Sequence, residues 1–198
     1  MARTLLAVVA VLLVLVIAVV GWAISVNNQL VRLEQDVNEK WAQVQNVYQR
    51  RADLIPNLVE TVKGFATQER TVLNEVISAR ARASSIQISA QAPTDPAALR
   101  QFQAAQNELG GALGRLLVTV ERYPELRSNQ NFLALQTQLE GTENRIAVER
   151  RRFNEAVREY NTRIRLFPGS IVAGMRGFRE KVFFEAAPDA AAPPKVKF

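Results

Sequence analysis

The side chains that could do chemistry in this chain are limited to oxygen and amine groups, because its 198 residues include no cysteine and no histidine. A thiolate nucleophile and an imidazole base are therefore absent. The sequence contains no Ser-x-x-Lys pair, no glycine-rich phosphate loop and no carboxylate pair at metal-binding spacing on an apolar face. We predict a protein without enzymatic activity, cofactor or small-molecule substrate, while an oxygen-only Mg²⁺ or Ca²⁺ site stays open.

The most distinctive polar residues surround a proline in the first half of the chain. They are Arg50, Arg51, Asp53, Pro56, Asn57 and Glu60. In one interpretation, these arginines and carboxylates tie a helix kink at Pro56 to neighbouring helices through charge-assisted hydrogen bonds, with Glu143 or Arg145 as partners. The alternative is a docking site for a partner at the bend. We favour the structural interpretation because helix surfaces are normally charged.

The densest basic patch is Arg150-Arg151-Arg152, in a chain of net charge +6. Nucleic-acid-binding surfaces interleave basic and aromatic residues over a longer stretch, and we find no such pattern. The patch therefore predicts a solvated helix face and no nucleic-acid partner. Binding of anionic lipid headgroups stays open if this part of its helix lies near a membrane.

The first element of the chain, which comes before these polar groups, is strongly apolar. Residues Leu5 to Ile24 read LLAVVAVLLVLVIAVVGWAI, without charge or proline. A helix of this length can cross a hydrocarbon core of about 30 Å. A cleaved signal peptide would have a shorter apolar core and small residues where Trp22 stands, and a buried core helix would need a larger protein around it. We predict a retained membrane span.

The charges that flank the span predict its orientation. Arg3 precedes it, and Arg32 is soon followed by Glu34 and Asp36. By the positive-inside rule, the N-terminus lies in the cytoplasm and the remaining chain lies outside, in a periplasm-like space.

Beyond the span, apolar residues recur every three or four positions, as on one face of amphipathic helices. Such stripes run from Leu30 to Val76, from Leu99 to Val120 and from Phe132 to Phe167. We predict that the span and the first stripe form one nearly continuous helix, kinked at Pro56 rather than reversed there. The apolar phase continues through Pro56, which argues against a hairpin.

Turn and capping residues set the expected boundaries. Residues 83–95 form a predicted loop, and Asp95 caps a helix that begins at Pro96 and ends at Tyr123-Pro124. Ser128 caps the next helix, which Phe167-Pro168-Gly169 stops. A short helix follows within residues 170–184.

Three glycines lie inside the second of these helices. They are Gly110, Gly111 and Gly114. Because glycine destabilises a helix interior, either a neighbouring helix packs unusually close to them or the helix bends there, and we favour close packing.

The predicted fold is therefore all-α. A single N-terminal transmembrane helix continues into a long antiparallel up-and-down bundle of three long helices and a short fourth. The expected divisions are an anchor at 1–26, a bundle at 27–185 and an Ala/Pro-rich tail at 186–198.

Several short motifs together resemble the LemA family. The stretch RRADLIPNLVETVKGFA at residues 50–66 is the most specific. The others are Trp41, Tyr123-Pro124-Glu125-Leu126, Thr142-Glu143-Asn144-Arg145, Tyr160-Asn161, Phe167-Pro168 and Gly177-Phe178. The resemblance covers essentially the whole chain. It implies a bacterial inner-membrane protein with one N-terminal span and a helical bundle, and no established activity.

The candidate structural or interaction residues combine the polar group and the motifs of this resemblance. They are Trp41, Arg51, Asp53, Pro56, Asn57, Glu60, Glu143, Asn144, Arg145, Tyr160, Asn161, Phe167, Pro168 and Phe178.

Two functions remain open. The first helix is longer than its partners, so part of its stripe would need cover from a second copy of the chain, which predicts a homo-oligomeric scaffold in the plane of the bilayer. The alternative is an adaptor for a membrane protease or an envelope-stress system, with residues 193–198 docking as an extended segment on a membrane-protein partner.

Overall fold

The computed structural model describes residues 2–65, 69–86 and 91–185, and within them all regular structure is helical. The helices are α1 (Ala2–Phe65), α2 (Arg70–Ser85), α3 (Pro96–Val120), α4 (Pro124–Arg127), α5 (Gln130–Arg165) and α6 (Gly169–Arg176). A long N-terminal apolar helix followed by a bundle confirms the predicted fold class.

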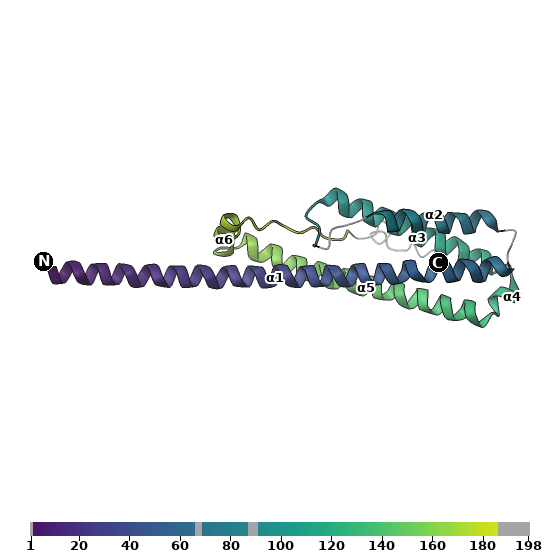
Figure 1. Ribbon diagram of the computed structural model, residues 1–198, viewed down its shortest axis with the longest axis horizontal. Coiled ribbons are helices and arrows are strands. Elements are labelled where there is room, and N and C mark those ends of the chain that lie inside the picture. Colours follow the sequence, from purple (N-terminus) through teal and green to yellow (C-terminus); the bar gives the residue numbers. More distant parts are fainter. Residues whose placement is uncertain (1, 66–68, 87–90, 186–198) are drawn as a thin grey trace, which may run out of the picture.

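α1 extends far beyond the other helices at its N-terminal end (Figure 1). The residues of the predicted span are exposed along their whole length, and the most apolar window of α1 is 0% buried by the rest of the chain. α1 is therefore long and apolar enough to cross a membrane. We call the end of the bundle next to this segment the membrane side, and the opposite end the distal end.

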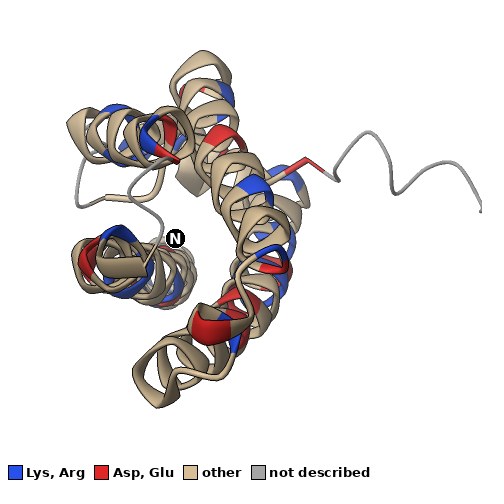
Figure 2. Ribbon diagram, turned by 90° about the vertical axis from the view of Figure 1, so that its right-hand side faces the viewer, with Lys and Arg blue, Asp and Glu red and all other residues tan. Residues whose placement is uncertain are grey.

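The bundle alternates in direction, as Figure 1 shows. α1 runs to the distal end, α2 returns, α3 runs out again and α5 returns along α1. α2 and α3 lie antiparallel and are joined by two exposed ion pairs, Arg82–Glu108 and Arg115–Glu75. A third pair, Arg122–Glu69, joins the residues that flank these helices. Figure 2 looks along the bundle and shows acidic and basic residues interspersed over its helices.

The prediction that the first helix continues to Val76 is wrong, because α1 ends at Phe65 and the chain reverses before Arg70. Leu73 and Val76 are buried in the bundle from α2 instead. A stripe with helical spacing has the same appearance on two antiparallel helices that share a core, so periodicity alone does not detect the reversal.

α1 passes through Pro56 as one helix, which confirms the absence of a hairpin there. Asp53 lies inside α1, and its carboxylate accepts a hydrogen bond of 2.7 Å from Gln49 one turn earlier.

The buried residues form two clusters along the bundle. The membrane-side cluster includes Trp41, Phe153 and Tyr160. The distal cluster includes Ile55 and Leu116. These apolar clusters supply the main driving force for packing the helices together.

The expectation of a surplus apolar stripe on the first helix is also wrong. From Val26 to Val62 the stripe of α1 is buried inside the chain, mainly under α5 and α2. The large apolar side chains of α1 that stay exposed lie in the span, apart from Val31 and Phe65. The bundle therefore covers its own core without a second copy.

Capping chemistry fixes two helix starts. The Asp95 side chain accepts a hydrogen bond from the Ala97 N–H, with Pro96 in the first turn, as predicted. Asn129, and not Ser128, caps α5 by accepting from the Phe132 N–H. Ser128 follows the short helix α4, which the sequence did not predict.

The expectation of close helix packing at the three glycines of α3 is wrong as well. A Cβ atom at Gly114 would meet nothing within 4 Å. At Gly110 and Gly111 the nearest atoms are the ends of arginine side chains, Arg51 at 4.0 Å and Arg115 at 3.6 Å.

α2 extends to Ser85, so the predicted loop at residues 83–95 begins later than expected.

The C-terminal part is less helical than expected. α6 ends at Arg176, where Gly177 has a φ of 76°, a left-handed conformation that favours glycine. Residues 178–185, which we call the strap, then run back along the bundle without helical structure (Figure 1). The predicted tail at 186–198 lies outside the described residues.

Candidate functional site

The most deeply buried charge in the bundle is Arg51, which is 2% exposed. Its guanidinium donates to Glu143 Oε2 at 2.9 Å and to the Gln106 backbone carbonyl at 3.1 Å. It also donates to the Gln106 side chain and lies 5.2 Å from the centre of the Tyr48 ring. One side chain of α1 therefore joins α3 and α5, and we call Arg51, Gln106 and Glu143 the arginine joint.

The arginine joint lies between the two apolar clusters. Tyr48 is the last α1 residue of the membrane-side cluster and Ile55 is the first of the distal cluster. A buried ion gains little net stability after desolvation, but its partners fix the register of the helices that carry them. The guanidinium end of Arg51 also lies 4.0 Å from the point where a Cβ at Gly110 would stand.

The other members of the predicted polar group do not join this site. These residues are all exposed: Asp53, Pro56, Asn57, Glu60, Asn144 and Arg145. Glu60 pairs with Lys63 of its own helix at 3.7 Å. Within this polar group and its expected partners, the structure brings together only Arg51 and Glu143, because the other side chains face solvent.

Pro56 has a structural partner that the sequence did not reveal. Proline has no N–H, so the carbonyl four residues earlier, that of Ala52, loses its helical hydrogen bond. Arg80 Nε of α2 donates to this carbonyl at 2.8 Å. α2 thus supplies from outside the donor that Pro56 lacks, and α1 continues as a helix.

Two asparagines of α5 hold the strap. Asn161 donates to the Lys181 carbonyl at 2.8 Å and accepts from the Lys181 N–H at 3.0 Å. Asn154 makes the same pair of bonds with Phe184, at 3.0 and 2.9 Å. Asn154 and Asn161 are seven residues apart, which is about 10 Å along a helix. Lys181 and Phe184 are three residues apart, which is also about 10 Å in an extended chain, so each asparagine reaches its partner.

Side chains around the strap complete the membrane-side cluster. The Tyr160 hydroxyl donates to the Arg179 carbonyl at 3.0 Å, and Lys181 pairs with Glu34 at 3.0 Å. Burial of the Tyr160 side chain, together with the nearby Glu34 charge, raises the pKa of its phenol. Phe178 is half-buried against the same cluster.

Trp41 is fully buried at the centre of that cluster. Its ring centre lies 5.9 Å from Phe102, 5.4 Å from Phe153 and 5.9 Å from Phe184. These aromatic pairs have the tilted or edge-on geometries that ring quadrupoles favour. Trp41 is therefore a core residue that α3, α5 and the strap share.

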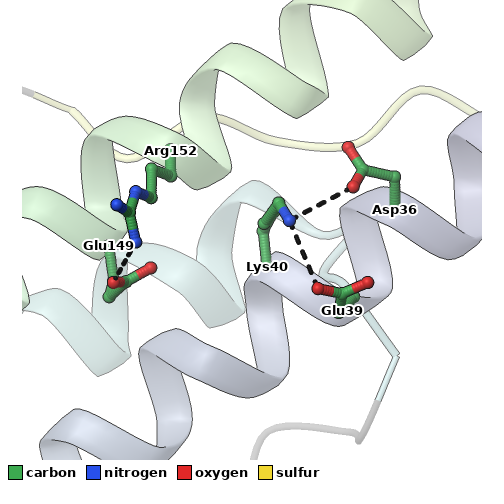
Figure 3. A network of polar contacts seen from close by, with 5 residues as sticks. All are labelled: Asp36, Glu39, Lys40, Glu149 and Arg152. Atoms are coloured by element: carbon green, nitrogen blue, oxygen red, sulfur yellow. Dashed lines mark hydrogen bonds and ion pairs between the residues drawn. The ribbon is translucent and has the colours of Figure 1, made fainter.

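A groove lined mostly by charged side chains lies between α1 and α5 and has a volume of about 490 Å³. In Figure 3, Lys40 points to Glu39 at 3.3 Å and Asp36 at 3.4 Å, and Arg152 points to Glu149 at 2.8 Å. The hydrogen bond that Lys40 donates to Glu39, and then the negative charge of Asp36, raise the pKa of Lys40. A more strongly protonated lysine is a poor general base, so the groove is a surface ion-pair network.

No group of three or more acidic side chains within the described residues could hold a metal ion. The Arg150–Arg152 patch lies too far from the end of the predicted span to bind lipid headgroups. Arg152 lines the charged groove beside Lys40, sixteen residues past Ile24, which is about 24 Å along the helix and well beyond a Debye length of roughly 8 Å. Arg150 instead lies over the Phe184 ring at 4.8 Å.

Phe167 and Pro168 form the corner between α5 and α6, and Phe167 is 75% exposed. Gly169 begins α6 at this corner. A Cβ atom at Gly169 would lie 2.1 Å from the Arg163 carbonyl oxygen, so the corner requires glycine. The predicted stop at residues 167–169 is confirmed, since α5 ends at Arg165.

These features define a class of protein: a helical bundle on a single N-terminal helix of membrane-spanning length, organised around a buried arginine joint. The sequence profile of the LemA family matches residues 40–198, so this chain belongs to the LemA family. The predicted resemblance is confirmed.

Several curated proteins are similar to the chain. Magnetosome proteins MamQ 1 and MamQ 2 of Paramagnetospirillum magneticum are each 26% identical over 197 residues, covering 90% of this chain and 71% of the relative. Magnetosome protein MamQ of Magnetospirillum gryphiswaldense is 27% identical, with coverages of 84% and 67%. Protein LemA of Metamycoplasma hominis is 20% identical, with coverages of 81% and 69%.

Proposed function

We propose that this protein is a membrane-anchored, non-enzymatic scaffold. The observation that carries the proposal is that α1 is one helix from Ala2 to Phe65, with an exposed apolar first part and a second part at the core of the bundle. A helix without a linker transmits its orientation directly. The bundle therefore tilts and turns together with the span as one rigid unit.

The length of α1 beyond the span sets the reach of the scaffold. Residues 25–65 are helical, and 41 residues at about 1.5 Å each give a reach of about 60 Å. The exterior carries both signs of charge and many ion pairs, which suits a soluble surface for protein partners (Figure 2). The names of the relatives, magnetosome protein MamQ and protein LemA, denote no enzyme, which supports a role other than catalysis.

Self-association in the plane of the membrane is part of this proposal, with α1 as the contacting helix. Because the stripe from Val26 to Val62 is buried, the contact would use the span and the solvent-facing side of α1. Asn46 and Gln49 are exposed on that side. Without native cysteines, a single Asn46→Cys variant can be cross-linked in native membranes, with Leu133→Cys on α5 as control.

Cross-linked dimers at position 46 and few at position 133 are the expected result. A chain that stays monomeric at both positions, and in native mass spectra from lipid discs, would contradict self-association. The anchored bundle itself would then remain as a monomeric platform.

The proposed location is a bacterial inner membrane, with the N-terminus in the cytoplasm and the bundle outside. The charge difference across the span supports this orientation. An impermeant thiol reagent should label an Ile77→Cys variant, exposed on α2, in intact spheroplasts. Labelling only after lysis would place the bundle in the cytoplasm.

An adaptor role is the alternative. The strap ends at Glu185, whose carbonyl accepts hydrogen bonds from Gln103 at 3.2 Å and Arg150 at 3.0 Å, so the following residues leave from a fixed point. Deleting residues 186–198 separates the two proposals. Under the scaffold proposal assembly survives the deletion, whereas an adaptor loses the turnover of its clients.

A further inference from the structure

α6 lies beside the end of the predicted span, at the membrane side of the bundle (Figure 1). The two helices share an open hollow of about 380 Å³. The hollow is lined by Val20, Ala23, Ile24, Asn27, Val172, Met175 and Arg176. α6 is therefore level with the last turn of the span, although the two segments lie far apart in the sequence.

The corner and α6 expose four large apolar side chains within ten residues. Their exposed fractions are 56% for Leu166, 75% for Phe167, 52% for Ile171 and 82% for Met175. The opposite side of α6 is buried against the bundle through Val172. An apolar edge of this size on a soluble surface indicates an interaction surface.

Two arginines follow this edge in the sequence, Arg176 in the last turn of α6 and Arg179 three residues later. Arg176 donates to the Asn27 side chain at 3.2 Å, and neither Arg176 nor Arg179 forms an ion pair with a described residue. The nearby carboxylate of Glu180 is taken by Arg165. Two guanidinium groups are thus available to anions from outside the chain.

We propose that this edge is a second membrane contact, seated in the headgroup layer of the bilayer that α1 spans. The apolar side chains enter the boundary between headgroups and acyl chains, and Arg176 and Arg179 bind the phosphates of anionic lipids. The occupant follows from position, since any bilayer around Leu5–Ile24 ends level with α6. The inference depends on the proposed membrane anchor.

Such a contact has a mechanical consequence. A single span leaves a bundle free to rotate about the helix axis and to tilt. A second contact on one side of that axis fixes both, so it determines which face of the bundle is presented away from the membrane.

Single-cysteine variants of the full chain, labelled with bimane and placed in vesicles, test this directly. Met175→Cys reports on the edge, Val14→Cys on the span and Ile77→Cys on an exposed site of the bundle. Quenching by nitroxide lipids and by aqueous iodide is compared in phosphatidylcholine and in a mixture with phosphatidylglycerol. An Arg176→Gln, Arg179→Gln background tests the charges.

The expected result is strong lipid quenching at positions 14 and 175 and iodide quenching at 77. Phosphatidylglycerol increases the lipid quenching at 175 severalfold, and the arginine substitutions abolish the increase. Equal lipid quenching with and without phosphatidylglycerol would overturn the role of the arginines.

Iodide quenching at 175 equal to that at 77, with 14 still in lipid, would overturn the second contact and leave the scaffold standing. Shielding of 175 from both quenchers would show a protein partner on the edge and would also overturn it. Loss of lipid quenching at 14 would remove the anchor, and with it the proposed function.

Discussion

Arg80 donates a hydrogen bond of 2.8 Å to the carbonyl of Ala52, the group that Pro56 leaves without its helical donor. An unpaired carbonyl in a packed interface costs about 1–3 kcal/mol, so the contact offsets the part of the proline penalty that comes from the missing hydrogen bond. It also ties α2 to α1 beside the arginine joint.

The Arg80–Pro56 relationship predicts strong coupling. Arg80→Met should lower the free energy of unfolding by about 1–2 kcal/mol in the native background, because the Ala52 carbonyl loses its donor. In a Pro56→Ala background the alanine N–H supplies that bond, and the loss should fall by more than half. Denaturation of the full chain in detergent, followed by circular dichroism, measures this double-mutant cycle. Equal losses in the two backgrounds would show that Arg80 acts through packing alone.

The arginine joint should be asymmetric. The side chain of Glu143 is 61% exposed, so Glu143→Gln should lower the free energy of unfolding by less than about 1 kcal/mol. Arg51→Ala removes the donors to Gln106 and leaves a cavity between the clusters, which should cost about 3 kcal/mol or more. Similar losses for the two variants would contradict a joint whose strength lies on its buried side.

The strap should depend on both asparagines. Asn161→Ala leaves the N–H and the carbonyl of Lys181 without partners and should cost about 2 kcal/mol. Hydrogen exchange in residues 178–185 should accelerate, with a smaller effect in the rest of the bundle. Asn144→Ala, an exposed asparagine on the same helix, is the matched control. Unchanged exchange in the strap after Asn161→Ala would refute the proposed attachment.

The corner before α6 should tolerate no side chain at its glycine. Gly169→Ala places a Cβ against the Arg163 carbonyl and should lower the unfolding midpoint by several degrees, about 2–4 °C for each kcal/mol in a chain of this size. Gly174→Ala, in the same helix with nothing within 4 Å, should be neutral or stabilising. A lowered midpoint for Gly174→Ala together with an unchanged midpoint for Gly169→Ala would show that the strained glycine is not Gly169.

Stability should fall in alkaline solution. Burial raises the pKa of Tyr160, so above pH 10 the unfolded chain releases a proton that the folded chain retains. The contribution of Tyr160 is therefore fully present below about pH 10 and is lost as the pH rises further. Tyr160→Phe should flatten this decline between about pH 10 and 11.5. An unchanged slope in Tyr160→Phe would assign the decline to other groups.

The sequence predicts the fold class and the helix boundaries that have local chemistry. Asp95-Pro96 begins α3 and Phe167-Pro168-Gly169 ends α5, because caps and proline act within a few residues. The reversal after Phe65 has no such signal, since the apolar phase of α2 continues that of α1. Periodicity shows which side of a helix is buried, but it does not show what buries it.

Pairings across the bundle were harder to predict. The sequence indicates the link between Arg51 and Glu143 as one option, but it does not predict the contacts of Gln106 and Arg80. Both contacts involve a backbone carbonyl, because Arg51 donates to the Gln106 carbonyl and Arg80 donates to the Ala52 carbonyl. The apolar spacing within residues 170–184 predicts a helix for most of the strap, whereas the seven-residue spacing of Asn154 and Asn161 is the sequence signal that fits an extended partner. Such contacts depend on the tertiary arrangement, which one sequence does not contain.

The account depends on α1 being one uninterrupted helix from the bilayer to the bundle. Spin labels at Gly21→Cys and Asn57→Cys of the full chain, diluted with unlabelled chain in lipid discs, measure this by double electron–electron resonance. The account predicts one narrow distribution near 54 Å, from 36 residues at about 1.5 Å each. A broad distribution, or a clearly shorter distance, would show a hinge at the membrane surface and contradict the fixed scaffold.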